Sequence, residues 1–149
     1  MNDDYRDILT ALVGRSVRFL VVGAHALAAH GYPRATVDID IWIDATPENA
    51  ERVWRALADF GAPLDALDVR AEDLTQPDVV AQFGLAPNRI DILTGVSGLS
   101  FAAAWENRVE EVIEGVRVPV LSLRDLKENK RASGRDKDRA DVKGLEGKS

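Results

Sequence analysis

Two aspartates separated by one residue stand in a segment that alternates apolar and polar side chains. Residues 37–44 read VDIDIWID, and this period of two is typical of a half-buried strand. Asp38 and Asp40 would project from one face, while the isoleucines between and after them enter the core. Two carboxylates about 4 Å apart repel by roughly 4 kcal/mol at an effective dielectric constant of about 20. Hydration, protonation of one group or a cation such as Mg²⁺ or Mn²⁺ would relieve that repulsion.

A third aspartate lies in a second apolar segment. Residues 89–93 read RIDIL, which predicts a strand with Asp91 between two isoleucines. An aspartate at an inward-facing position of an apolar strand is costly unless it is used. Clusters of carboxylates that hold two metal ions about 3.5–4 Å apart promote in-line displacement at phosphorus. The three aspartates therefore indicate phosphoryl transfer, although a paired-aspartate strand by itself also occurs as an ordinary surface strand.

A glycine separates a predicted strand from a predicted short helix. Residues 18–22 form a β-branched and aromatic run, and residues 24–30 read as a helix that ends at Gly31. Gly23 stands between them. Backbone N–H groups at the start of a helix attract anions, so this junction is a candidate phosphate contact.

The remaining segments predict the elements that position these residues. Helices and strands mix without a strict β–α–β pattern, which favours an α+β fold with a mixed β-sheet flanked by helices. No repeat or linker divides the chain, so we expect a single domain over residues 1–149 with a helical C-terminal segment at 122–146. The further expected helices cover residues 4–13, 47–60, 101–107, 122–133 and 138–145, and the further expected strands cover residues 79–83, 109–113 and 116–120.

Composition excludes several classes of protein. The 149 residues include no cysteine, which excludes disulfides, thiolate metal sites and cysteine nucleophiles. A net charge of −6 makes non-specific binding of duplex DNA a poor candidate. We see neither a long apolar run nor a signal peptide, so we expect a cytoplasmic protein without a membrane segment.

Positive charge is concentrated near the C-terminus. Every lysine lies after residue 123, and Lys127, Lys130 and Arg131 have the spacing of one helix face. This segment is either a solvated helix of mixed charge or a local contact for phosphates.

Together these features resemble the polymerase-beta-like nucleotidyltransferase superfamily. Its signature is an apolar residue, Gly, then Gly or Ser, and later a strand in which aspartates and apolar residues alternate. Here the two parts read Val22-Gly23-Ala24 and Asp38-Ile39-Asp40-Ile41. The chain is most similar to small bacterial nucleotidyltransferase-like proteins, a group that includes minimal nucleotidyltransferases and abortive-infection toxin relatives. The similarity covers residues 18–145, with support from residues 31–36, 89–93 and 126–143.

This resemblance implies a metal-dependent enzyme that moves a nucleoside monophosphate from an NTP, such as ATP, to an acceptor hydroxyl and releases pyrophosphate. Asp38 and Asp40 would bind two metal ions, Mg²⁺ or Mn²⁺. Asp91 would bind the catalytic ion and help activate the acceptor hydroxyl. The acceptor could be a small molecule, a tRNA end or a protein.

The resemblance and the local pattern also suggest which residues contact the nucleotide. Ala24 stands where the signature has Gly or Ser, so it offers a backbone N–H but no hydroxyl. His25 could supply a phosphate donor instead, or could simply face solvent at the start of its helix. Arg34 could reach the triphosphate or pair with a nearby acid. The expected nucleotide-binding set is Gly23, Ala24, His25, Arg34, Thr36, Lys130 and Arg135.

Other functions are compatible with parts of the pattern. A haloacid-dehalogenase-like phosphatase also begins from paired aspartates, but it usually has Thr or Val where Trp42 stands and carries the motif on its first strand. An EF-hand is excluded because Ile43 occupies the glycine position. A non-catalytic nucleotidyltransferase-like module acting through a partner chain, as in a toxin–antitoxin pair, is the main alternative. The short segment after Asp91 favours it, since acceptor binding could then require a partner chain or a homodimer.

Overall fold

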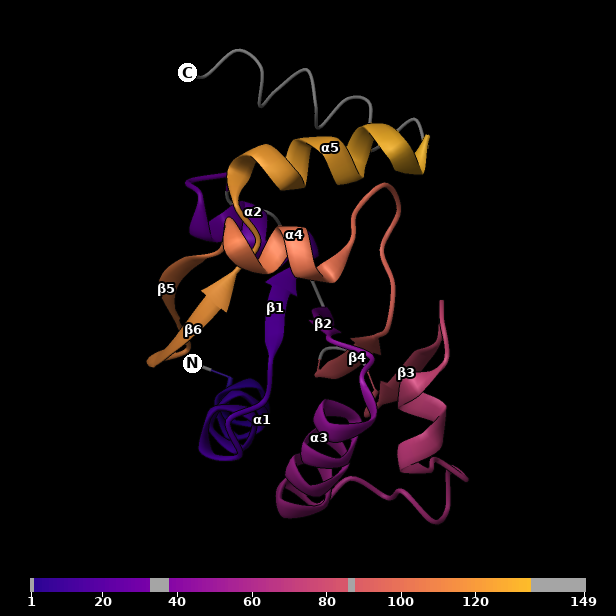
Figure 1. Ribbon diagram of the computed structural model, residues 1–149. Coiled ribbons are helices and arrows are strands. Elements are labelled where there is room, and N and C mark those ends of the chain that lie inside the picture. The colour runs from indigo at the N-terminus through magenta and orange to yellow at the C-terminus, as the bar shows by residue number, and fades with distance from the viewer. Residues whose placement is uncertain (1, 33–37, 86–87, 135–149) are drawn as a thin grey trace.

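The computed structural model of the chain describes residues 2–32, 38–85 and 88–134 (Figure 1). The fold is α+β, with a mixed six-stranded sheet and flanking helices, which confirms the predicted class. The strands are β1 (Phe19–Val22), β2 (Asp38–Ile43), β3 (Val80–Phe83), β4 (Arg89–Leu93), β5 (Val109–Ile113) and β6 (Val116–Val120). The helices are α1 (Asp3–Gly14), α2 (Gly23–Ala29), α3 (Pro47–Phe60), α4 (Phe101–Glu106) and α5 (Leu123–Ser133), with a 3₁₀ turn at Ala71–Thr75.

The order of strands in the sheet is β3-β4-β2-β1-β6-β5. Strand β1 is antiparallel to β2 and parallel to β6, and β2 is parallel to β4. The edge strands β3 and β5 are each antiparallel to their neighbours. The three strands that carry the predicted chemistry, β1, β2 and β4, therefore lie side by side.

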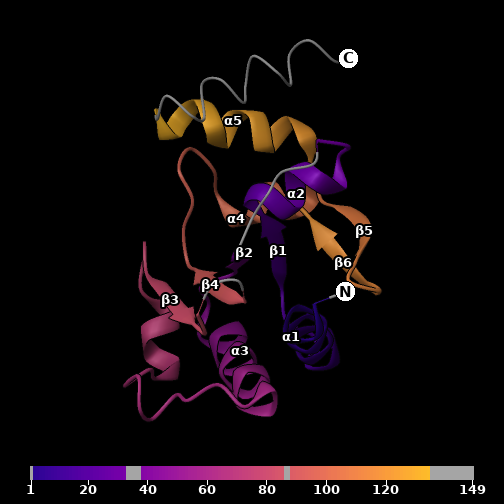
Figure 2. The same cartoon turned by 180° about the vertical axis from the view of Figure 1, so that it is seen from behind.

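Helices α1 and α3 pack against each other and close much of the core (Figures 1 and 2). The side chain of Asn2 caps α1 by accepting a hydrogen bond from the backbone N–H of Tyr5, and Thr46 caps α3 in the same way. Pro47 suits the first position of α3 because it has no N–H to leave unpaired. Both helices bury an apolar stripe, and the core also contains the three isoleucines of β2.

Helix α5 crosses one end of the molecule beside α2 and α4 (Figures 1 and 2). Its first turn is capped by Ser122, whose hydroxyl accepts from the backbone N–H of Asp125 at 3.1 Å, and it ends at Gly134 with a φ of 69°. The loop before α4 lies close to α5, because a Cβ on Gly98 would come within 2.5 Å of the Cβ of Ala132. These contacts hold α5 over the loop that follows β4.

The alternation predicted for β2 holds only over its first half. Asp38 and Asp40 are half-buried and Ile39 is buried, but Trp42 is also buried at 1% exposure. The edge of the Trp42 ring meets Phe101 of α4 at a centroid distance of 5.2 Å. Because α4 covers this part of the face, the accessible part of β2 is the part that carries the aspartates.

Most predicted elements occur within a residue or two of their expected bounds. The hairpin at residues 109–113 and 116–120 and the helix at 47–60 have the predicted limits. The expected helix at 138–145, and with it the end of the predicted segment 122–146, lies outside the described residues. None of the described helices is long and apolar enough to span a membrane.

Candidate active site

The register of the sheet brings the three predicted carboxylates together. Asp40 of β2 is the direct partner of Asp91 in the parallel strand β4, and Asp38 is the partner of Arg89. Direct cross-strand partners project from the same face of a sheet. Asp91 is buried at 6% exposure, and the other two aspartates are half-buried. The three carboxylates and one guanidinium therefore form a cluster on a single face.

Gly23 closes the cluster on the β1 side. Because β1 and β2 are antiparallel, Val22 lies opposite Asp40, and Gly23 is the next residue. Its φ of 66° lies in the left-handed region, and a Cβ at this position would overlap with Oδ2 of Asp40. The sequence suggested this glycine for its backbone approach to phosphate. The structure adds a second reason, which is the room that it leaves for the Asp40 carboxylate.

Burial and the neighbouring negative charges change the protonation of Asp40. Burial, followed by the charge of Asp91 and a hydrogen bond with it, raises the pKa of Asp40 to about 6. Asp38 acts in the same direction, and Arg89 opposes the shift without cancelling it. The pair of facing carboxyl groups therefore retains a proton at pH values at which an ordinary aspartate is fully ionised.

Arg89 supplies positive charge inside the cluster. Its Nη2 donates to Oδ2 of Asp38 at 2.6 Å, and the same nitrogen lies 3.4 Å from Oδ2 of Asp91. Its Nε is 3.2 Å from Oδ1 of Asp91. Partial burial acts to lower the pKa of Arg89, but the neighbouring carboxylates outweigh it and raise that pKa, so the guanidinium stays charged. Arg89 thus bridges two of the three candidate metal ligands.

Tyr5 and His25 pack together next to the carboxylates. The Tyr5 hydroxyl donates to the backbone carbonyl of Arg89 at 3.3 Å, and its ring meets His25 edge-on at 5.3 Å. Burial and the charges of the three aspartates raise the pKa of Tyr5 to about 12. Burial lowers the pKa of His25, although Glu114 and the backbone of Asp38 act the other way. Both rings are therefore neutral near pH 7.

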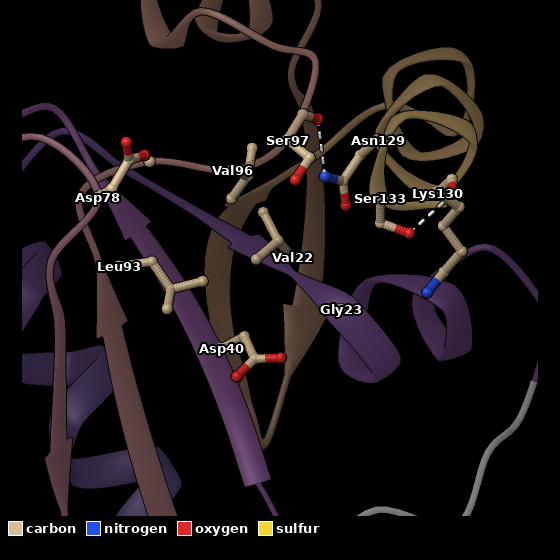
Figure 3. A pocket seen from close by; sticks show the side chains of 11 residues that line it. Val22, Gly23, Asp40, Asp78, Leu93, Val96, Ser97, Asn129, Lys130 and Ser133 are labelled. Atoms are coloured by element: carbon tan, nitrogen blue, oxygen red, sulfur yellow. Dashed lines mark hydrogen bonds between the residues drawn. The ribbon is translucent and has the colours of Figure 1, made fainter. Parts of the chain in front are cut away.

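A pocket of about 460 Å³ opens beside Asp40 (Figure 3). It lies between the sheet face, the loop after β4 and helix α5. Two residues of the predicted nucleotide-binding set, Gly23 and Lys130, line it together with Asp40. The other lining residues are Val22, Asp78, Leu93, Gly95, Val96, Ser97, Asn129 and Ser133.

Lys130 enters this pocket from α5. It is buried at 8% exposure, and in Figure 3 its amino group extends from the helix toward Gly23 and the start of α2. The neighbouring Asn129 donates its side-chain amide to the carbonyl of Ser97 at 3.0 Å, and Ser133 donates its hydroxyl to the carbonyl of Lys130 at 2.9 Å. The first bond connects α5 to the loop after β4, and the second lies within the last turn of α5.

The other predicted nucleotide contacts are placed differently. Ala24 and His25 follow Gly23 in α2 but do not line the pocket. Arg34, Thr36 and Arg135 lie outside the described residues. Reasoning from the sequence missed the loop at residues 94–100, TGVSGLS, whose glycines and serines directly after the third carboxylate strand were the available signal. A Cβ at Gly95 in this loop would lie 2.6 Å from Oδ1 of Asp78.

The cluster offers donor atoms and negative charge of the kind that a divalent cation prefers. Carboxylate oxygens are the ligands that Mg²⁺ and Mn²⁺ prefer. Burial and the charges of Asp91 and Asp38 raise the pKa of Asp40 against the opposing effect of Arg89, and the buried Oδ1 of Asp91 has no hydrogen-bond partner within the described residues. The side chains as they stand are arranged around Arg89 instead. Across residues 2–32, 38–85 and 88–134, no three His, Asp or Glu side chains form a group that could hold a metal ion.

Comparisons with known proteins agree with the motif and the fold. A crystal structure described as that of a "putative nucleotidyltransferase" from Thermotoga maritima has a TM-score of 0.63 and 21% sequence identity, covering 97% of this chain and 91% of that one. At 21% sequence identity, the similarity between the two structures shows that they share a fold. None of the curated proteins matches the chain significantly. Residues 6–146 match the family model described as "nucleotidyltransferase of unknown function (DUF6036)". That match spans nearly the whole sequence, so the chain belongs to this nucleotidyltransferase family.

Proposed function

We propose that this protein is a metal-dependent nucleotidyltransferase that transfers a nucleoside monophosphate from an NTP to an acceptor hydroxyl. One observation carries the proposal. Asp40 faces Asp91 in register, Asp38 lies on the same face, and the pocket beside them is lined by Gly23 and Lys130. An arrangement of carboxylates next to a pocket that contains a buried lysine suits a substrate that brings phosphate and divalent metal together.

The three aspartates would hold Mg²⁺ or Mn²⁺, which supplies charge neutralisation at the reacting phosphate when bound. Lys130, buried and directed into the pocket, would meet oxygens of the triphosphate as a point charge. The acceptor oxygen would form a bond to the α-phosphorus while the bond to the bridging oxygen breaks, and pyrophosphate would leave. Asp91 would bind the catalytic ion and help to remove the proton of the acceptor hydroxyl.

Titration calorimetry with the purified protein tests the proposal. Each NTP is added in the presence of Mg²⁺ and again with EDTA. We expect micromolar binding of at least one NTP that depends on the metal. Absence of binding by every NTP under both conditions would overturn the proposal and favour the non-catalytic module that acts through a partner chain.

Matched variants test whether metal-dependent NTP binding requires the aspartates of the cluster. Replacement of both Asp38 and Asp40 by Asn should abolish metal-dependent NTP binding. Asp68→Asn makes the same chemical change at a side chain that is 88% exposed, and its φ of 53° is one that Asn adopts readily. That control should bind like the wild type. Tight metal-dependent binding by the double variant would contradict the assignment of the site.

Transfer itself is measured with an NTP labelled at the α-phosphate. The label should become attached to an acceptor, and pyrophosphate should appear in equal amount. Candidate acceptors to supply are small hydroxyl compounds, tRNA and proteins. Pyrophosphate release that Asp91→Asn abolishes would support the role of that carboxylate.

A further inference from the structure

The candidate metal ligands are already connected by a cation that belongs to the chain. Arg89 is two residues before Asp91 in β4 and is the cross-strand partner of Asp38, so its side chain must leave the same face as both. It donates to Asp38 at 2.6 Å and contacts both oxygens of Asp91 at 3.2 and 3.4 Å. These contacts use oxygen atoms that a divalent cation would also use.

Arg89 makes a short hydrogen bond with Asp38 and longer contacts with Asp91. The bond to Asp38 is short, as expected for a charge-assisted hydrogen bond. The contact between Nε and Oδ1 of Asp91 is an ion pair without hydrogen-bond geometry, since neither atom has a hydrogen-bond partner within the described residues. The Arg89 side chain is 37% exposed, so it has a route to solvent. Arg89 is therefore able to leave the cluster without unfolding the strand.

We propose that Arg89 is an internal cation that competes with the divalent metal for Asp38 and Asp91. In the metal-free protein it balances part of their charge, and it must release at least Asp38 before a metal ion is bound. The inference rests on the proposed function, because it concerns the same carboxylates. Its consequence is that the free protein binds metal weakly, and that removal of the guanidinium strengthens metal binding.

The test measures metal binding without nucleotide or catalysis. Mn²⁺ is titrated into the nucleotide-free protein and followed by calorimetry or by the loss of the free-ion electron paramagnetic resonance signal. Arg89→Met removes the charge and retains much of the apolar stem. We expect Mn²⁺ to bind the variant roughly ten- to a hundredfold more tightly than the wild type, the factor that corresponds to one charge-assisted hydrogen bond. Unchanged or weaker binding by the variant would overturn the inference.

Thermal unfolding gives a second readout. Without metal, Arg89→Met should melt at a lower temperature than the wild type, because the three acids lose their cation. Mn²⁺ should raise the melting temperature of the variant by more than that of the wild type. If Arg89→Met does not fold, Arg89→Gln takes its place with the same expectations. Equal Mn²⁺-induced shifts in the variant and the wild type would count against competition.

A control variant at another arginine tests whether the effect is specific to Arg89, and a titration with nucleotide separates this inference from the proposed function. Arg55→Met removes an arginine that pairs with Glu51 at 3.1 Å on the exposed surface of α3, and it should leave Mn²⁺ affinity unchanged. Binding of Mn²⁺ with an NTP by the wild type, combined with equal Mn²⁺ affinity in Arg89→Met, would overturn only the role of Arg89. Failure of every protein to bind Mn²⁺, with or without an NTP, would overturn the proposed function as well.

Discussion

Asp40 and Asp91 are direct partners in neighbouring parallel strands, and the nearby Asp91 carboxyl group helps to raise the pKa of Asp40. Like charges at such a position are unfavourable, and the protein lessens the cost in two ways. The pKa of Asp40 rises to about 6, and Arg89 pairs with Asp91 and Asp38. Under the proposed function, a divalent cation bound by the three aspartates would replace both of these effects. Binding of a cation would then change both the protonation and the ion pairs of the cluster.

The raised pKa of Asp40 predicts how stability depends on pH in the metal-free protein. A carboxyl group with a raised folded-state pKa stabilises the fold at pH values below its ordinary pKa, and that contribution is lost as the pH rises through about 6. The wild type should therefore lose about 1–3 kcal/mol of unfolding free energy between pH 4 and 7.5 relative to Asp40→Asn. Urea unfolding of both proteins in EDTA, at several pH values, measures this difference in unfolding free energy. Parallel pH profiles for the two proteins would contradict the shift.

Metal should reverse this pH dependence. Mg²⁺ and Mn²⁺ require the ionised carboxylate, so their binding should release a proton from the Asp40–Asp91 pair and weaken as the pH falls below about 6. Calorimetry in buffers of different ionisation enthalpy counts the protons released at pH 6. A proton count that is zero at pH 6 would show that the pair is already fully ionised there.

Neutralising the two aspartates of β2 should have different effects on stability. Asp40→Asn removes a carboxylate that is repelled by Asp91, so the metal-free variant should be as stable as the wild type at pH 7.5, or more stable. Asp38→Asn removes the partner of Arg89 at 2.6 Å, so it should cost about 1–3 kcal/mol. Both should lose metal-dependent NTP binding. Urea unfolding separates the two cases, and greater stability for Asp38→Asn than for Asp40→Asn would contradict the ion-pair assignment.

Much of the fold follows from local patterns, because caps, glycine stops and apolar periods act over short distances. Thr46 and Pro47 begin α3, and Gly115 turns the hairpin of β5 and β6, as predicted. The apolar–polar alternation also identified Asp38, Asp40 and Asp91. The alternation does not predict that Trp42 is buried, because the burial of Trp42 depends on α4, which packs over the far end of β2.

The relationships within the site depend on long-range pairing and could not be obtained in the same way. Strands β2 and β4 are separated by many residues, so the local pattern does not specify that Asp40 faces Asp91 or that Arg89 reaches Asp38. Lys130 was suggested by its charge and helical position, whereas Asn129 and Ser97 are polar residues of a common kind. Their contribution to the pocket became evident only from the packing of α5 against the loop after β4.

Gly23 should be intolerant of even a methyl group. Gly23→Ala places a Cβ against Oδ2 of Asp40 and forces a φ of 66° on a residue that disfavours it. We expect a loss of about 2–4 kcal/mol in unfolding free energy and impaired metal binding. Gly14→Ala, where a Cβ meets nothing within 4 Å at the end of α1, is the matched control and should be neutral or slightly stabilising. Equal stability of the two variants, by urea unfolding, would show that the close approach at Asp40 is readily relieved.

Lys130 should contribute to nucleotide affinity through its charge. Lys130→Met keeps a long side chain on α5 but removes the amino group that extends toward Gly23. The variant should therefore bind Mg²⁺–NTP at least about tenfold more weakly than the wild type. Its affinity for Mn²⁺ without nucleotide should be unchanged. The loss should be larger for an NTP than for the corresponding NMP, because the missing charge would face the triphosphate. Lys127→Met, a change one turn away on the same helix at a half-buried position, is the control and should have little effect. Calorimetry on both variants, with melting temperatures to confirm folding, measures the difference. Equal NTP affinity for Lys130→Met and the wild type would place the triphosphate away from α5.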